Sequence, residues 1–109
     1  MAGPEHAEIT VGPLPESALE AHAALIAQQL DPIRQVMGEG ATSTLTLILP
    51  AAGPEHDRWR RALAGDLARE YAPKRVNLAA GPAGEELDTL LAYLRDAPGV
   101  TGHYLQTHE

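Results

Sequence analysis

Histidine is the residue type of this chain best suited to acid–base or metal chemistry, and there are five of them. Their spacing contains neither HxxxH nor HExxH, the patterns that place two imidazoles on one face of a helix for zinc. His22 and His56 are therefore interpreted as solvated or interface side chains. A pair of His56 with Glu55 or Asp57 could act as acid and base, but neighbouring side chains diverge on a helix surface and no candidate nucleophile is near in sequence. We predict no metal site and no catalytic residue.

Anions bind at helix N-termini, where free backbone N–H groups and positive potential meet. In this chain, each turn that leads from a strand to a helix carries a proline, which removes one donor: Pro13, Pro54 and Pro82. Carboxylates follow in or near the first turns: Glu16, Glu55, Asp57, Glu85 and Glu86. We interpret this as the self-capping of structural helices in preference to a phosphate site. We expect no cofactor and no NAD(P).

The charge balance argues against two classes of partner. The 109 residues include 8 lysines and arginines against 15 aspartates and glutamates, a net charge of −7 that repels phosphate backbones and anionic lipids. The absence of cysteine excludes a disulfide, a thiolate nucleophile and a zinc–thiolate site. The first residues lack the basic start and apolar run of a signal peptide, and no stretch reaches the roughly 20 apolar residues of a membrane span. We expect a cytoplasmic protein that binds neither nucleic acid nor membrane.

Hydrophobic periodicity and turn residues divide the chain into alternating strands and helices. Strands are expected at 7–12, 42–49, 75–79 and 100–107. Helices are expected at 17–38, 54–72 and 87–94, with a kink or break at Pro32 in the first. The order βαβαβαβ predicts an α/β fold in a single domain of residues 1–109, with a four-stranded, mainly parallel sheet, three helices and right-handed crossovers.

Apolar and polar or smaller residues alternate along the strands, whereas the strands of a parallel sheet covered on both faces usually form continuous apolar runs. Leu45, Leu47 and Leu49 are separated by threonine and isoleucine. We therefore expect the helices to be concentrated on one face of the sheet, with the other face less well covered.

Three segments, taken together and in order, resemble a known family. They are LDPIRQVMGEGATSTLTLILPAAG (30–53), LAREYAPKRVNLAAG (67–81) and EELDTLLAYLRDAPGVTGHYL (85–105). They resemble the second half of the short-chain dehydrogenase/reductase family: its interface helix and following strand, the end of its catalytic helix with the next strand, and its last helix with a VTGQxL strand. The resemblance implies a half-Rossmann-like fold that is degenerate and truncated.

The chain departs from that family at every position that would carry the reaction. The resemblance places the catalytic serine at Leu49 and Pro50, and the tyrosine and lysine of the YxxxK motif at Gly53 and Asp57. None of these side chains can perform the corresponding role. The glycine-rich TGxxxGxG turn has no counterpart, and the loop after Ala79 is short. The resemblance therefore implies a protein that is not an enzyme.

Two hypotheses of function follow. The first is a non-catalytic interaction module, a homodimer or larger assembly or the subunit of a hetero-partner, because relatives pair through the corresponding helices and small side chains allow helices to approach closely. Its candidate interface residues are Ala18, Ala21, Ala24, Ala27 and Trp59. The alternative is a small-molecule or nucleotide-binding protein, or an enzyme, that uses the crevice at the carboxyl ends of the strands. Its candidate residues are Pro50, Asn77 and Gly81.

Overall fold

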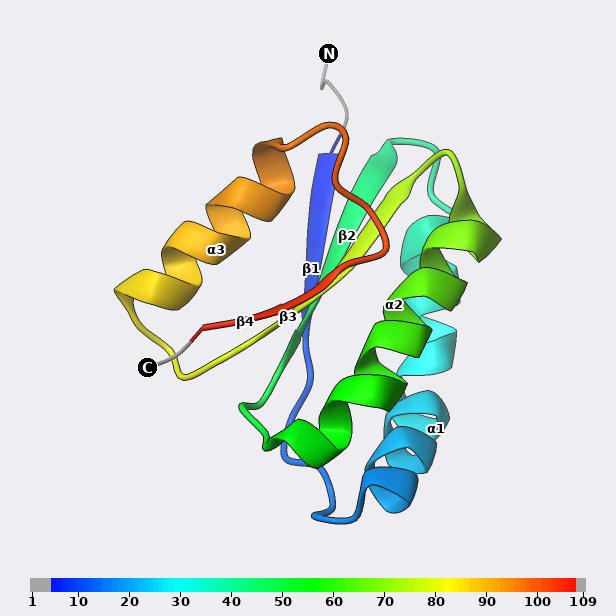
Figure 1. The fold of residues 1–109 in the computed structure, drawn as a ribbon. Helices are drawn as coiled ribbons and strands as arrows, with labels where there is room; N and C mark the ends of the chain where they lie inside the picture. Colours follow the sequence, from blue (N-terminus) through cyan, green and yellow to red (C-terminus); the bar gives the residue numbers. More distant parts are fainter. Residues whose placement is uncertain (1–4, 108–109) are drawn as a thin grey trace.

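The computed structural model describes residues 5–107, which form one parallel sheet flanked by helices (Figure 1). The strands, in the spatial order β1-β2-β3-β4, are Glu5–Thr10, Thr42–Leu49, Arg75–Ala80 and Tyr104–Gln106. The helices are α1 (Ala18–Met37), the short 3₁₀ helix η1 (Pro54–His56), α2 (Asp57–Tyr71) and α3 (Glu85–Asp96). The predicted half-Rossmann-like α/β fold is confirmed, and every strand pair is parallel.

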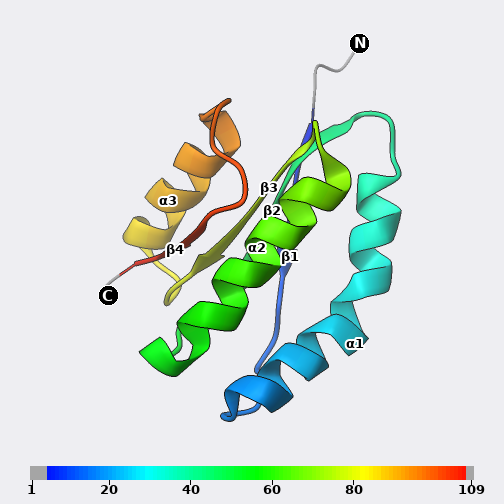
Figure 2. The same ribbon diagram turned by 45° about the vertical axis from the view of Figure 1, so that its right-hand side comes forward.

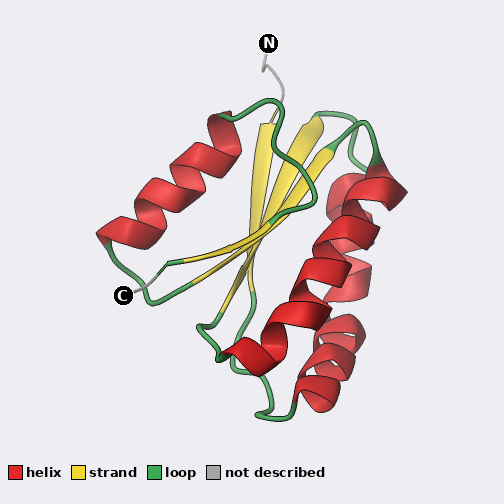
Figure 3. Cartoon of the chain, viewed as in Figure 1, coloured by secondary structure: helices red, strands yellow, loops and turns green. Residues whose placement is uncertain are grey.

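The sheet separates two apolar clusters. Figure 3 shows the helices that cover them on opposite sides of the strands. Leu45, Leu47 and Leu49 of β2 point into the larger layer, beneath α1 and α2. Ile48 and Ala79 point the other way and contact α3. Two helices thus share one face, as the alternating strands predict, and the third covers part of the opposite face.

The position of α3 determines the hand of the last crossover. Each connection moves to the next strand in the same direction across the sheet. Since α1 and α2 lie on one face and α3 on the other, the crossover from β3 to β4 has the opposite hand to the first two. The expectation that all three crossovers are right-handed is therefore wrong, because right-handed connections in this order would place every helix on one face.

Local sequence signals explain the ends of α1. The Ser17 side chain accepts a hydrogen bond from the backbone N–H of Glu20 at 3.2 Å, which caps the first turn. Gly38 caps the other end, and its N–H donates to Arg34 O. Pro32 lies inside the helix without splitting it, and Figure 2 shows α1 bending along its length. None of the described helices is long and apolar enough to cross a membrane.

The last strand is shorter than predicted because a side chain replaces part of its backbone pairing. Asn77 of β3 is fully buried, its amide donates to Val100 O at 3.0 Å, and its carbonyl oxygen accepts from His103 N at 3.0 Å. Gly102, between these two partners, has a φ of 78°, which favours glycine. Regular pairing therefore begins only at Tyr104.

Candidate functional site

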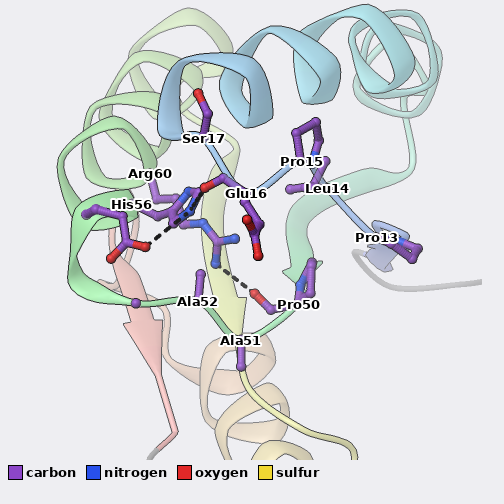
Figure 4. A pocket seen from close by; sticks show the side chains of 12 residues that line it. Pro13, Leu14, Pro15, Glu16, Ser17, Pro50, Ala51, Ala52, His56 and Arg60 are labelled. Atoms are coloured by element: carbon purple, nitrogen blue, oxygen red, sulfur yellow. Dashed lines mark hydrogen bonds and ion pairs between the residues drawn. The ribbon is translucent and has the colours of Figure 1, made fainter.

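A hollow of about 760 Å³ lies at the carboxyl edge of the sheet, where β1 and β2 end (Figure 4). Residues 13–17, which lead into α1, form one wall, and residues 50–53, which follow β2, form the other. Glu55 and His56 of η1 and Arg60 of α2 complete the lining. Neighbouring parallel strands end at the same edge, so the loops that follow them face each other across a crevice, the usual place for a ligand in an open α/β sheet.

Arg60 is the most unusual side chain of this hollow, because it is only 1% exposed yet carries a full charge. Its Nη1 donates to Pro50 O at 2.9 Å and to Tyr104 Oη at 3.2 Å. The guanidinium carbon also lies 5.3 Å from the ring centre of Trp59 and 5.6 Å from that of Tyr104, within cation–π range. Among the described residues Arg60 has no carboxylate partner, and its buried Nε has no hydrogen bond.

His56, although buried, has both ring nitrogens satisfied. The indole N–H of Trp59 donates to His56 Nδ1 at 3.0 Å. Because the indole can only donate, Nδ1 carries no proton, so Nε2–H is the donor to Glu16 O, also at 3.0 Å. The His22 ring stacks on Trp59 with centroids 4.9 Å apart. This cluster joins the start of α1 to α2, and its closed hydrogen bonding leaves His56 no free nitrogen for acid–base work.

One of the three crevice residues predicted from sequence lines the hollow. Pro50 does, and its carbonyl also accepts from Arg60. Asn77 does not, because its amide is used entirely in holding the approach to β4. Gly81 faces Thr107, whose side chain a β-carbon at this position would meet. The crevice therefore lies over β1 and β2, away from β3.

A sequence model of short chain dehydrogenase-like proteins matches residues 9–107. This chain belongs to the short chain dehydrogenase-like family. No curated protein and no solved structure matches it.

In this short chain dehydrogenase-like protein, the positions aligned with the catalytic residues of full-length dehydrogenases lie near the hollow. Pro50 and Gly53 line it, and Asp57 begins α2 and lines a smaller adjoining hollow of about 340 Å³. Proline and glycine offer no hydroxyl group, and aspartate offers a negative charge where a lysine ammonium would be needed. The described part of the chain also contains no cluster of three or more metal-ligating side chains.

The interface candidates predicted from sequence divide into buried and exposed residues. Ala21 and Trp59, 0% and 8% exposed, pack into the chain's own core, which leaves them little or no surface for a partner, contrary to the prediction that they form an interface. Ala18 packs partly against the same core, and Ala24 is half-buried. Ala27 is exposed and lines an apolar groove of about 410 Å³ on the outer side of α1. The groove lining is Leu19, His22, Ala23, Ile26 and Ala27.

Sequence reasoning overlooked Arg60. The large apolar residues of α2, Trp59, Leu63 and Leu67, recur every four residues and mark the face of the helix that packs inward. Arg60 nevertheless lies three residues before Leu63 and four before Ala64, both buried, so helical spacing places it on the inner face of this family member. An arginine on an inward-facing position was the available signal.

Proposed function

We propose that this protein is a non-catalytic member of the short chain dehydrogenase-like family that forms a homodimer through the outer groove of α1. The observation that carries the proposal is that α1 is apolar on two faces. Its inner stripe is buried under the sheet: Ala21, Leu25, Ile33 and Met37. Its outer stripe is exposed at Leu19 (76%), Ala23 and Ala27, while Ile26 packs partly against the core. A helix with two apolar faces is typical of one that is covered on both sides.

A second copy of the chain fits this groove because of its small side chains. Ala23 and Ala27 are one helical turn apart, and Leu19 and Ile26 flank them. Two such stripes can pack around a twofold axis, with the leucine and isoleucine of each copy beside the alanines of the other. The exposed Glu20 and Gln28 border the groove and provide the polar rim of such a contact.

The non-catalytic part of the proposal is supported by the side chains at the site. Pro50, Gly53 and Asp57 cannot supply a hydroxyl proton donor or an ammonium group, and His56 has no free nitrogen. The hollow therefore retains a binding shape without the serine, tyrosine and lysine that the family resemblance would place there. A small-molecule binder at this hollow remains the second candidate, and the charge of Arg60 favours it.

The dimer is tested by measuring mass with multi-angle light scattering at micromolar concentration. The wild type should have the mass of two chains. Ala23→Arg and Ala27→Arg should each shift the mass toward one chain, because a long charged side chain holds the two helices apart. Gln35→Arg, at an exposed position of α1 outside the groove lining, should not. A wild-type monomer at every practical concentration, or a dimer that both alanine variants leave intact, would contradict the proposal.

The absence of catalysis is tested separately with purified protein. It should neither oxidise alcohols nor reduce carbonyls with NAD or NADP, and millimolar dinucleotide should leave Tm unchanged. Saturation at 100 times Kd would instead add about 2.7 kcal/mol of stability and a clear rise in Tm. Turnover that survives repurification and disappears with a point substitution in the hollow would show that the protein is an enzyme.

A further inference from the structure

Arg60 is a buried cation whose charge the chain does not balance. Nη1 makes two hydrogen bonds, to Pro50 O and Tyr104 Oη. Nε is buried without a partner, and Nη2 has no hydrogen bond to the described residues. Burying an ionised group without a counter-ion is costly unless some other group compensates it. The vacant edge of the guanidinium, formed by Nε–H and Nη2–H, is therefore the part of this side chain that lacks a partner.

The shape of that vacant edge indicates the kind of ligand. Two parallel N–H groups in a rigid plane match the two oxygens of a carboxylate, and such paired hydrogen bonds are the usual geometry of arginine with carboxylates. Pro13, Leu14 and Pro50 form the apolar part of the hollow's lining, whereas Glu16, Ser17 and Glu55 form a polar part. The apolar part suits an apolar body attached to the carboxylate.

The remaining charges of the hollow disfavour a phosphate. Glu16 and Glu55 also line it, and the chain carries a net charge of −7. A doubly charged anion would be repelled about twice as strongly by these carboxylates as a singly charged one. Proline and carboxylate residues also occupy the helix starts that would otherwise bind phosphate.

We infer that the hollow at the carboxyl edge of β1 and β2 is a binding site for a small monocarboxylate with an apolar body, held by the Nε–Nη2 edge of Arg60. This site is independent of the dimer contact proposed above, because the α1 groove and the hollow share no lining residue. The proposal is one of binding alone and involves no covalent step. The site takes up and releases its ligand unchanged.

The negative charge of Glu16 opposes binding of a carboxylate at this site. Glu16 is exposed, and Figure 4 shows its side chain pointing into the hollow that Arg60 also lines. A negative charge at this entrance weakens the attraction of Arg60 for a second carboxylate. Removing the charge while keeping the size of the side chain should therefore strengthen ligand binding.

The test is a titration of the full-length chain with sodium butyrate, acetate and inorganic phosphate at constant ionic strength and pH 7. The Nε–Hε resonance of Arg60, followed by NMR, should shift saturably with butyrate, more weakly with acetate and least with phosphate. Arg60→Lys and Arg60→Met should weaken butyrate binding by on the order of tenfold or more, as expected for loss of a charge-assisted pair. Glu16→Gln should strengthen it severalfold, and Arg58→Met, an exposed arginine of the same helix, should leave it unchanged.

Three results would overturn the inference. The first is an Arg60 Nε–Hε resonance whose chemical shift does not change when butyrate is in 50-fold or greater molar excess. The second is tighter binding of phosphate than of butyrate. The third is an equal loss of affinity in Arg58→Met and the Arg60 variants. If the Arg60 variants do not fold, the wild-type resonance and the Glu16→Gln titration decide the question, and an affinity that Glu16→Gln leaves unchanged then counts against the site.

Discussion

The buried and half-buried cations at the amino ends of the strands (the amino edge) and at their carboxyl ends (the carboxyl edge) differ in how fully they are hydrogen-bonded. At the amino edge, Lys74 Nζ donates to Met37 O at 2.7 Å and to Glu39 O at 2.9 Å. Beside it, the Arg75 guanidinium donates to three carbonyls at the end of α3: Leu94 O, Arg95 O and Ala97 O. At the carboxyl edge, Arg60 donates only through Nη1 and keeps its other edge vacant.

This contrast separates a structural role from a binding role. The last carbonyls of a helix have no partner within the helix and carry negative potential, so a cation that binds them satisfies the helix and itself. Lys74 closes α1 in this way and Arg75 closes α3. Arg60 lies where loops meet instead of where a helix ends, so the chain offers too few acceptors to satisfy it. The cations of the amino edge are thereby satisfied, whereas Arg60 at the carboxyl edge has an unpartnered Nε, on which the proposed binding site rests.

The largest effect is expected at the amino edge. Arg75→Met should lower the free energy of unfolding by about 3 kcal/mol, because three helix-end carbonyls lose a charged donor at once. Urea denaturation followed by circular dichroism measures it. Arg61→Met, an exposed arginine without a hydrogen bond among the described residues, should change stability by less than about 0.5 kcal/mol. Equal effects of the two substitutions would remove the structural role assigned to Arg75.

A smaller effect is expected from the closed cluster beside the hollow. Trp59→Phe keeps an aromatic ring but removes the donor to His56 Nδ1, which is buried. Leaving that nitrogen without a partner should cost about 1–2 kcal/mol. Tyr93→Phe, at a ring that is 53% exposed, is the matched control and should be close to neutral. A neutral Trp59→Phe would mean that His56 finds another partner and that the carboxyl edge is less rigid than described.

Arg60→Met sharpens the comparison most directly. Removing an unpaired buried charge offsets the loss of its two hydrogen bonds, so the substitution should cost no more than about 1 kcal/mol without ligand. Measured under the same conditions, it should be clearly milder than Arg75→Met. A loss as large as that of Arg75→Met would place both arginines in the same structural class and would weaken the case for a vacant binding edge.

Most of the fold was predictable because its signals are local. The apolar run of β2, the Ser17 cap and the terminating Gly38 each act over a few residues, so the element order and most bounds agree with expectation. The face on which α3 packs was not predictable. It depends on tertiary packing of Leu87 and Leu94 against Ala79, and either face was compatible with the helical spacing of those leucines.

The site was predictable only in position. Parallel strand order favours a ligand site at the carboxyl edge, and Pro50 lines the hollow that lies there. The key side chain was missed because arginine is usually solvated, and only the packing of α2 against the sheet reveals that Arg60 is buried. The sequence also did not distinguish the buried alanines of α1 from the exposed ones. Composition marked the helix as suited to close packing, but only the three-dimensional structure separates the buried Ala21 from the exposed Ala27.

The smallest predicted effect concerns His6, on β1 at the amino edge. Burial lowers the pKa of His6, Glu8 at 3.4 Å opposes that shift, and the nearby cations Arg95 and Arg75 add to it. Because the folded-state pKa lies below the ordinary value near 6.5, the unfolded chain binds a proton first as the pH falls. The contribution of His6 to stability is therefore complete above about pH 6.5 and is lost on acidification through its folded-state pKa.

Between pH 7.5 and 5.5 the wild type should lose more stability than His6→Gln, by a few tenths of a kcal/mol once solvent screening is considered. Gln35→Ala, at an exposed position of α1 without a titratable side chain, should keep the wild-type pH dependence. If His6→Gln retains it as well, folding does not lower the pKa of His6, and neither burial nor the nearby cations act on it as described.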